Sequence, residues 1–333
     1  MTPIRGRRMF RWPRKPDWRG VAQFGAAWIG VAYTAFVLIW IAFRTTTGEE
    51  IGIVRYATVF QPWIALGCFA VAGFYFWRRA WWAGPLPLLL ALVLGGPYFH
   101  LFWPSRADAR GPVAFTAMTF NTYGLNKTPE GVVRIVLAQK PDIAFLQEVS
   151  APDDVVAGLR GLYGGAQVYF AREPSLELLV ASRFPLTALP PVEGIQKVVV
   201  HLPQGDLTTW NLHGPKTYYG TDLQYRVIRK LAADVDATSG AALAAGDFNA
   251  TEQSAVYSYL IDRLHDAHAD AGFGLGATFP ARGRRLGIFP AMIRIDHLFF
   301  TPPLAVLETH VVGDSGGSDH YPVYARFAWG PSQ

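Results

Sequence analysis

The sequence predicts an α/β domain with a mixed sheet, preceded by three membrane-spanning helices. Three long apolar runs occupy the first third of the chain, and from Val113 onward short apolar strands alternate with amphipathic helices. Charged residues make up 17% of the chain, below the roughly 25% of soluble domains, which indicates that part of it lies in a membrane. The later part, of about 220 residues, is long enough to bury a core.

The three apolar runs cover residues 21–43, 57–77 and 83–103. At about 1.5 Å per residue, each run can cross roughly 30 Å of hydrocarbon as a helix. The first is too long for the apolar part of a cleaved signal peptide, which has about 7–15 residues. Tryptophans near the ends of the runs are typical of membrane interfaces, which argues against buried core helices: Trp40, Trp77, Trp81, Trp82 and Trp103. We therefore predict a three-helix anchor over residues 21–103.

The charges are distributed unevenly along the chain. Residues 1–112 contain 13 Lys and Arg against 4 Asp and Glu, whereas residues 113–333 contain 17 against 21. The basic segment 1–20 and Arg78-Arg79 indicate that these parts face the cytoplasm. Three spans then place the part after a short linker, residues 104–112, outside the cytoplasm at a bacterial inner or plasma membrane. The acidic balance there makes nucleic acid an unlikely partner.

The part from residue 113 to 333 shows the alternation of an α/β domain. The Thr128-Pro129-Glu130 start and the apolar spacing that follows predict a helix to about Gln139. Further helices are expected over residues 222–237 and about 254–263. Apolar runs predict strands over residues 113–120, 142–147, 176–182, 197–202, 207–212, 241–245, 295–300 and 321–327.

Six of these strand ends carry carboxylate, amide or imidazole side chains. They are Asn121, Gln147-Glu148, Asn211 with His213, Asp247 with Asn249, Asp296-His297 and Ser318-Asp319-His320. The Gly-Asp-x-Asn pattern at residue 246 is, on its own, also ordinary turn chemistry. Several converging carboxylates imply a metal ion, and oxygen-rich ligands without a usable thiolate favour Mg²⁺ or Mn²⁺ over zinc. Such an ion beside an Asp–His pair suits phosphoryl chemistry.

The ordered set of these motifs resembles the endonuclease/exonuclease/phosphatase superfamily. The motifs are Phe120-Asn121, Leu146-Gln147-Glu148, Asn211-Leu212-His213, Gly246-Asp247-Phe248-Asn249, Ile295-Asp296-His297 and Ser318-Asp319-His320. The resemblance covers nearly all of residues 113–333. It implies a four-layer α/β sandwich, with two mixed sheets flanked by helices, and Mg²⁺-dependent hydrolysis of a phosphoester by in-line attack of water. It leaves open whether one or two metals bind.

The resemblance also implies residue roles around the metal. Glu148 would be the principal ligand, with Asn121 and Asp319 completing or supporting the site. Asp247 would orient or deprotonate the attacking water, and Asn249 would hold the phosphate or the attacking group.

The imidazoles receive separate roles. His320 would contact the phosphate while Asp296 pairs with its ring, and His213 would lie beside the scissile phosphate. We expect His297 to be structural.

A basic and apolar stretch precedes the Asp296 strand. Arg282, Arg284 and Arg285 lead into the apolar residues 286–293. We interpret it as a loop whose tip touches lipid while the arginines bind an anionic head group; the alternative is an ordinary loop packed on the sandwich.

The anchor and this domain together resemble bacterial membrane proteins of the superfamily that are linked to glycopeptide resistance and thought to act on polyprenyl pyrophosphate carriers. We therefore predict a membrane-anchored, extracytoplasmic hydrolase of a lipid-linked phosphate, such as polyprenyl pyrophosphate or a phospholipid. The alternatives are an extracytoplasmic nuclease and a catalytically inactive scaffold or binding module.

Overall fold

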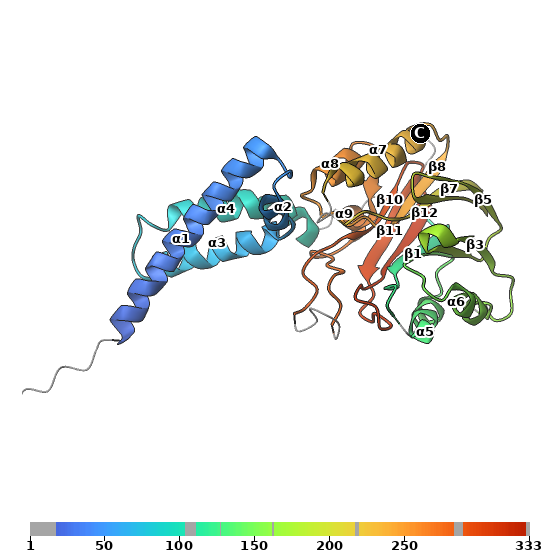
Figure 1. The fold of residues 1–333 in the computed structure, drawn as a ribbon, viewed down its shortest axis with the longest axis horizontal. Coiled ribbons are helices and arrows are strands. Elements are labelled where there is room, and N and C mark those ends of the chain that lie inside the picture. The colour runs from blue at the N-terminus through green and yellow to red at the C-terminus, as the bar shows by residue number, and fades with distance from the viewer. Residues whose placement is uncertain are drawn as a thin grey trace, which may run out of the picture.

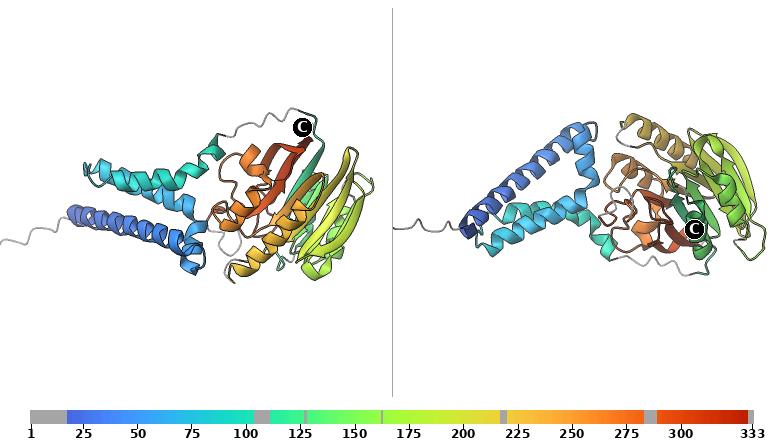
Figure 2. Two further views of the ribbon diagram at one scale, coloured as in Figure 1. Left: turned by 90° about the horizontal axis from the view of Figure 1, so that it is seen from above. Right: turned by 60° about the horizontal axis from the view of Figure 1, so that its bottom comes forward.

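The computed structural model describes residues 18–103, 111–126, 128–161, 163–216, 220–282 and 289–330. An N-terminal group of helices, here called the helical unit, lies beside a larger α/β unit (Figure 1). The α/β unit contains two packed sheets with helices outside them (Figure 2).

The helical unit consists of α1 (Trp18–Thr47), α2 (Gly52–Val59), α3 (Gln61–Trp77), α4 (Pro85–Gly95) and the 3₁₀-helix η1 (Gly96–Phe102). Among the described residues, two helices are long and apolar enough to cross a membrane, Gln23–Thr47 and Pro85–Phe102. The second predicted run is instead divided between α2 and α3, which meet at an angle of 75°. Pro62 lies in the first turn of α3, where its missing N–H is tolerated, so the chain begins a new helix there. A third span exists only if this bent pair crosses as one unit.

The first sheet has the strand order β11-β12-β1-β2-β4-β3. Its strands are β1 (Phe115–Asn121), β2 (Ile143–Gln147), β3 (Tyr169–Glu173), β4 (Leu178–Ser182), β11 (Leu304–Val311) and β12 (Val323–Trp329). Strands β1 and β2 are parallel, and the other pairs are antiparallel. Helices α5 (Pro129–Gln139) and α6 (Pro152–Leu159) pack on its outer face, and η2 (Pro174–Leu176) precedes β4.

The second sheet has the order β5-β6-β7-β8-β10-β9. Its strands are β5 (Leu186–Val192), β6 (Ile195–Leu202), β7 (Gly205–His213), β8 (Ala241–Asp247), β9 (His265–Asp266) and β10 (Asp296–Phe300). Here β7 and β8 form the parallel pair. Helices α7 (Asp222–Asp236) and α8 (Ala255–Ile261) cover the outer face, and α9 (Ala267–Ala271) follows β9.

The alternation of side chains along each strand produces four layers. In β2, Ile143 and Phe145 point into the core between the sheets, whereas Ala144 and Leu146 face α5 and α6. In β8, Leu243 likewise lies between the sheets. The predicted arrangement of two mixed sheets flanked by helices is therefore confirmed.

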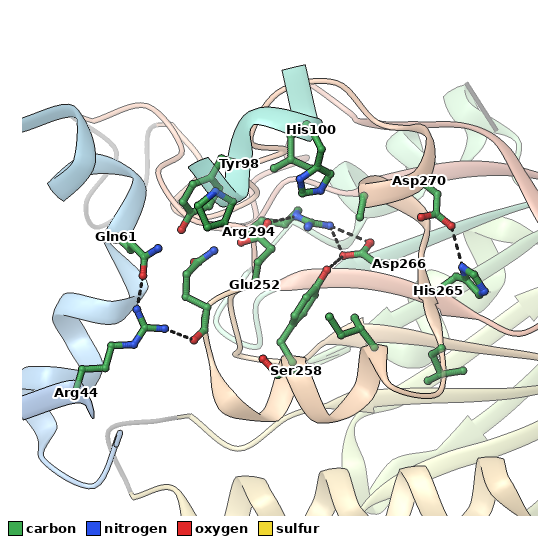
Figure 3. Close-up of a pocket in the computed structure, with 17 residues that line it drawn as sticks. Arg44, Gln61, Tyr98, His100, Glu252, Ser258, His265, Asp266, Asp270 and Arg294 are labelled. Carbon is green, nitrogen blue, oxygen red and sulfur yellow. Dashed lines mark hydrogen bonds and ion pairs between the residues drawn. The ribbon is translucent and has the colours of Figure 1, made fainter. Parts of the chain in front are cut away.

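The two units meet at a cavity of about 490 Å³ (Figure 3). Side chains from both units line it, including Arg44 and Tyr98 from the helical unit and Glu252 and Arg294 from the α/β unit. Beside this cavity, individual polar contacts join the two units. One of them is the hydrogen bond from Arg44 Nη2 to the carbonyl of Gln253 at 3.0 Å.

Candidate functional site

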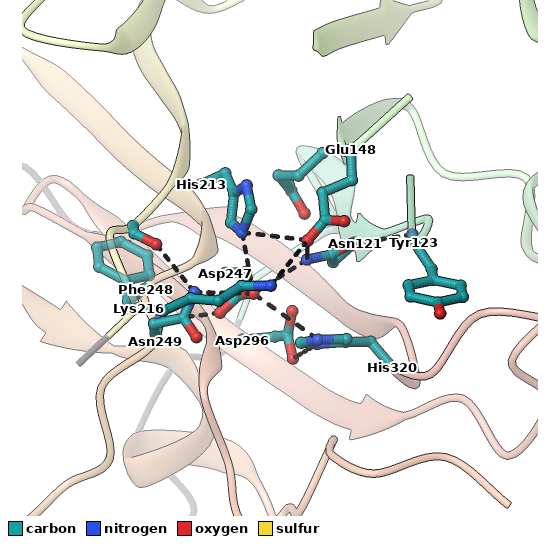
Figure 4. Close-up of polar contacts among 12 residues, drawn as sticks. Asn121, Tyr123, Glu148, His213, Lys216, Asp247, Phe248, Asn249, Asp296 and His320 are labelled. Atoms are coloured by element: carbon teal, nitrogen blue, oxygen red, sulfur yellow. Dashed lines mark hydrogen bonds and ion pairs between the residues drawn. The ribbon is translucent and has the colours of Figure 1, made fainter. Parts of the chain in front are cut away.

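The polar strand ends meet at one edge of the two packed sheets (Figure 4). Asn121 at the end of β1 lies opposite Gln147 at the end of β2. In the second sheet, His213 lies opposite Asp247, and Asp247 opposite Asp296. The parallel pairs bring the carboxyl ends of β1 and β2, and of β7 and β8, to a common edge. The expected convergence of these side chains is therefore present in the fold.

Asn121 connects the carboxylates of the two sheets. Its Nδ2 donates hydrogen bonds to Glu148 Oε1 and to Asp247 Oδ2, each at 3.0 Å. Its Oδ1 accepts from the backbone N–H of Tyr123 at 3.0 Å. The side chain is buried, so this bridge fixes the spacing of the two carboxylates across the sheet interface.

Glu148 is held as a carboxylate. Burial alone would raise its pKa, but the hydrogen bonds from Asn121 and the Gly124 amide, with the nearby His213 and Lys216 side chains, keep that pKa below its usual value. The Gly124 N–H donates to Oε2 at 2.9 Å, and His213 Nε2 lies 3.2 Å from Oε1. Lys216 Nζ is 3.9 Å from the same Oε1. An ionised, half-buried carboxylate of this kind is suited to bind a hard cation.

Asp247 occupies the centre of the site and is buried. Its Oδ1 accepts from the Asn249 backbone N–H at 2.9 Å, and its Oδ2 lies 3.8 Å from Nε2 of both His213 and His320. Burial raises the pKa of Asp247; the charge of His320 opposes this, and that of Asp296 adds to it. A carboxylate with a raised pKa is a better proton acceptor than an ordinary one.

Gly246 lets the chain bring Asp247 to this place. Its φ is +152°, and an added Cβ would lie 2.0 Å from the carbonyl oxygen of Leu212 on the neighbouring strand. No other residue fits so close to that backbone. The glycine of the Gly-Asp-Phe-Asn motif is thus explained by strand packing.

His320 pairs with Asp296 as predicted from the resemblance, Nδ1 lying 2.9 Å from Asp296 Oδ2. Burial opposes the charge on the ring, but Asp296 and Asp247 outweigh it and raise the pKa of His320 to about 10. The imidazole is therefore protonated at neutral pH, and Nε2 is available to donate to an anion. Ser318 helps to hold the loop, because its Oγ donates to the Asn121 carbonyl and accepts from the His320 amide.

Two groups of side chains among the described residues could hold a metal ion. Ligand atoms of Glu148, His213 and Asp247 lie within 4.8 Å of one another, as do those of Asp247, Asp296 and His320. The first group fits better, because a protonated His320 cannot act as a ligand. His213 Nε2, which has no aligned hydrogen-bond partner in the described part of the chain, is a buried atom directed at this group. Oxygen donors dominate the set, which fits Mg²⁺ or Mn²⁺.

The remaining predicted site residues are Asp319 and the three arginines. Asp319 belongs to neither group; burial raises the pKa of its carboxyl, the charge of His320 opposes this, and that of Glu148 adds to it. Its role as a ligand stays a prediction. Arg282 is exposed, and its amide donates to the Tyr321 hydroxyl beside His320. Arg284 and Arg285 lie outside the described residues.

Several polar residues have roles that their strand-end position did not reveal. Gln147 Nε2 donates to Asn211 Oδ1 at 2.8 Å, and both side chains are fully buried between the sheets rather than directed at the site. His297 is buried as well, its Nε2 2.9 Å from the Ala250 carbonyl, in agreement with the structural role expected for it. Among the described residues, Lys216 is a charged side chain at the site that the sequence did not single out; the signal for it is its place three residues after His213.

Comparison with known proteins agrees with this geometry. A family model described as the Endonuclease/Exonuclease/phosphatase family matches residues 118–320, more than half of the chain. A search of curated proteins found no match. Similar solved structures show the same fold: a family protein from Leptotrichia buccalis (TM-score 0.54, 17% identity, covering 65% of this chain and 100% of that one), one from Bacteroides thetaiotaomicron (0.55, 16%, 66% and 99%) and truncated TDP2 from Caenorhabditis elegans (0.52, 21%, 64% and 97%).

The matched span contains every one of the six strand-end motifs, and the chain belongs to the endonuclease/exonuclease/phosphatase family.

Proposed function

We propose that the protein is a membrane-anchored, extracytoplasmic, Mg²⁺-dependent hydrolase of a lipid-linked phosphoester. The observation that carries the hydrolase part is the continuous polar network from Glu148 through Asn121 and Asp247 to the His320–Asp296 pair. Within one site it connects an ionised carboxylate that can bind a metal (Glu148), a proton acceptor (Asp247) and a protonated imidazole that can donate a hydrogen bond (His320). The fold alone does not select the substrate.

The network assigns a task to each residue. Glu148, with His213, would hold the divalent ion beside Asp247, and this ion when bound would neutralise charge on the phosphate oxygens. Protonated His320 donates from Nε2 to a phosphate oxygen. Asp247 orients the attacking water and accepts its proton, so that a P–O bond to water forms as the bond to the leaving oxygen breaks. Asn249, whose Nδ2 donates to the Gly214 carbonyl at 2.9 Å, stays directed toward Asp247.

The lipid part of the proposal is supported by the helical unit and by one loop. Two helices are apolar and long enough to span a bilayer, and large apolar side chains on them are exposed, Ile29 to 71%. The stretch that begins at Arg282 starts beside the site, since the Ala281 amide donates to the Asp319 carbonyl at 2.7 Å. At its other end Phe289 is 52% exposed. A lipid substrate would place its phosphate at the site and its chains toward this side.

An assay of detergent-purified protein with Mg²⁺ tests the proposal. The substrates are a polyprenyl pyrophosphate, a phospholipid, and single- and double-stranded DNA, each with wild type, Asp247→Asn and the control Asp206→Asn. Asp206 is exposed on the β6–β7 hairpin and pairs with His201, away from the site. We expect release of phosphate or a phosphorylated head group by wild type and by the control only. Cleavage of DNA alone would establish the nuclease alternative, and inactivity of folded, metal-loaded protein on every substrate would establish the scaffold.

A further inference from the structure

The helical unit is hydrogen-bonded to two segments of the α/β unit that lie close in sequence to catalytic residues. Three hydrogen bonds make this connection: Arg44 Nη2 to the Gln253 carbonyl at 3.0 Å, the Ala255 amide to Glu49 Oε1 at 3.2 Å, and Trp63 Nε1 to the Met292 carbonyl at 2.8 Å. Gln253 and Ala255 follow the Asp247–Asn249 loop within six residues, and Met292 lies four residues before Asp296. The donors and acceptors of the helical unit come from the end of α1, the α1–α2 loop and the start of α3.

A buried ionic cluster joins these two segments to each other (Figure 3). Arg294 Nε donates to Glu252 Oε1 at 2.6 Å, and its Nη1 donates to both carboxylate oxygens of Asp266, at 2.8 and 3.0 Å. The Arg294 and Asp266 side chains are each 1% exposed. Glu252 is adjacent to Gln253, and Arg294 is two residues from Met292. Both residues of the cluster therefore lie next to a residue that is hydrogen-bonded to the helical unit.

The cluster in turn adjoins the catalytic residues through the backbone. The Phe248 amide donates to the Ile295 carbonyl at 2.9 Å, and Asp247 and Asp296 are paired across β8 and β10. His297 adds a contact between its Nε2 and the Ala250 carbonyl. A displacement of either segment would therefore change the spacing of Asp247 relative to the Asp296–His320 pair, and small errors in such spacing reduce catalysis strongly.

We propose that Arg44 and Trp63 are positioning residues: by holding the 252–255 and 292–294 segments, the helical unit sets the placement of Asp247 and Asp296 in the catalytic site. The helical unit is then a part of the catalytic apparatus as well as a tether. This inference rests on the proposed hydrolytic function for its kinetic test.

Hydrolysis of a soluble phosphodiester distinguishes a helical unit that only tethers the enzyme from one that also positions catalytic residues. A tether affects only substrates that lie in a membrane, so breaking its contacts would leave hydrolysis of bis(p-nitrophenyl) phosphate unchanged. A positioning element affects the chemical step on every substrate, so kcat for the soluble diester falls while KM, which reports its binding, stays nearly constant.

The test uses full-length protein in detergent with Mg²⁺. The variants are Trp63→Phe, which keeps an aromatic ring and removes the donor, and Trp63→Phe with Arg44→Met. The matched control is Trp77→Phe at the far end of α3, where the side chain is 73% exposed. We expect kcat to fall about threefold in Trp63→Phe and about tenfold in the double variant, which corresponds to ~1.4 kcal/mol, with KM and the control within about twofold of wild type.

Hydrogen exchange supplies a readout that needs no substrate. We expect the Phe248 amide, which is hydrogen-bonded to the Ile295 carbonyl, to exchange about tenfold faster in the double variant. The exchange rates of the β4 amides in the other sheet should stay as in wild type. The inference is overturned if kcat of both variants stays within about twofold of wild type, or if Phe248 exchange is unchanged. Wild type without activity on any phosphoester would instead refute the proposed function, and the exchange measurement would still decide the positioning role.

Discussion

Replacement of Arg294 by Met tests whether the buried ionic cluster holds the two catalytic segments together. The change removes the cation from between Glu252 and Asp266 and keeps an unbranched side chain in its place. Burial tends to raise the pKa of Asp266, and it is foremost the charge of Arg294 that keeps this pKa far below its usual value. Without that charge, the carboxylate keeps its hydrogen bonds from the Tyr257 hydroxyl and the His268 amide but loses its guanidinium partner, in a site where its side chain is 1% exposed.

The expected loss of stability follows from this burial. Removing one partner of a buried ion pair costs about 3–5 kcal/mol. In a unit of 150–250 residues, 1 kcal/mol corresponds to about 2–4 °C in Tm, so Arg294→Met should lower Tm by roughly 6–20 °C. The control is Arg134→Met, which breaks the exposed pair with Asp314, where the side chains are 59% and 52% exposed. Exposed pairs contribute little to stability, so its Tm should fall much less than that of Arg294→Met.

Thermal unfolding of the detergent-solubilised variants, measured at pH 8 and at pH 5, checks both expectations and their cause. In Arg294→Met, the pKa of Asp266 in the folded state rises above its unfolded value. Stability contributed by the protonated form is then present at low pH and lost as pH rises, so the deficit relative to wild type should be larger at pH 8. Equal Tm losses for the two arginine variants, or a deficit without pH dependence, would refute the reasoning.

Four further outcomes follow from the geometry. Gly246→Ala should destabilise the protein by more than about 3 kcal/mol in chemical unfolding, because its Cβ would lie 2.0 Å from a backbone carbonyl; Gly161→Ala, where nothing lies within 4 Å, should be nearly neutral. Burial lowers the pKa of His268 to about 4 from 6.5, so the stability that its neutral form contributes is complete above pH 6.5 and declines as pH falls toward 4, by on the order of 3 kcal/mol; a pH series with His268→Gln, in which this decline should be absent, checks it. Removal of divalent ions by EDTA should abolish hydrolysis and Mg²⁺ should restore it, whereas Glu148→Gln should require at least about tenfold more Mg²⁺ for half-maximal rate; an unchanged Mg²⁺ requirement would exclude Glu148 as a ligand. Phe289→Ser should reduce hydrolysis of lipid in vesicles about fivefold and leave a soluble diester unaffected, and equal effects on both substrates would contradict the lipid-contacting loop.

The sequence predicted the interior strands of both sheets but none of the four edge strands. Strands β1, β2, β4, β6, β7, β8, β10 and β12 were all expected, whereas β3, β5, β9 and β11 were not. Edge strands are covered on fewer sides, so their apolar pattern is weak: β5 has no buried residue and contains Pro190-Pro191, which a central strand would exclude. The missing elements are therefore those that the hydrophobic pattern specifies least.

The candidate site was predictable to the extent that strand ends determine it. The family resemblance of the ordered motifs identified Asn121, Glu148, Asp247 and the His320–Asp296 pair. The parallel pairs β1–β2 and β7–β8 explain why Asn121 and Asp247 come to one edge. Lys216 was missed, since its approach to Glu148 depends on the path of a loop after β7. The bend between α2 and α3 was also missed, because hydropathy measures composition over a run and is insensitive to a change of direction at Pro62.

Backbone conformation shows that the site is organised before any substrate binds. Tyr123, Glu148 and Asn249 all have positive φ, of 63°, 52° and 48°, which costs a residue other than glycine about 1 kcal/mol or more. Hydrogen bonds to neighbouring residues hold all three: the amides of Tyr123 and Asn249 donate to the side chains of Asn121 and Asp247, and the Glu148 carbonyl accepts from the Thr122 hydroxyl. The hydrogen bonds of the network thus maintain the strained backbone conformation, and loss of these bonds would let the loops relax. Because ordering has already been achieved in folding, binding energy from a substrate can be used for the transition state rather than for assembling the site.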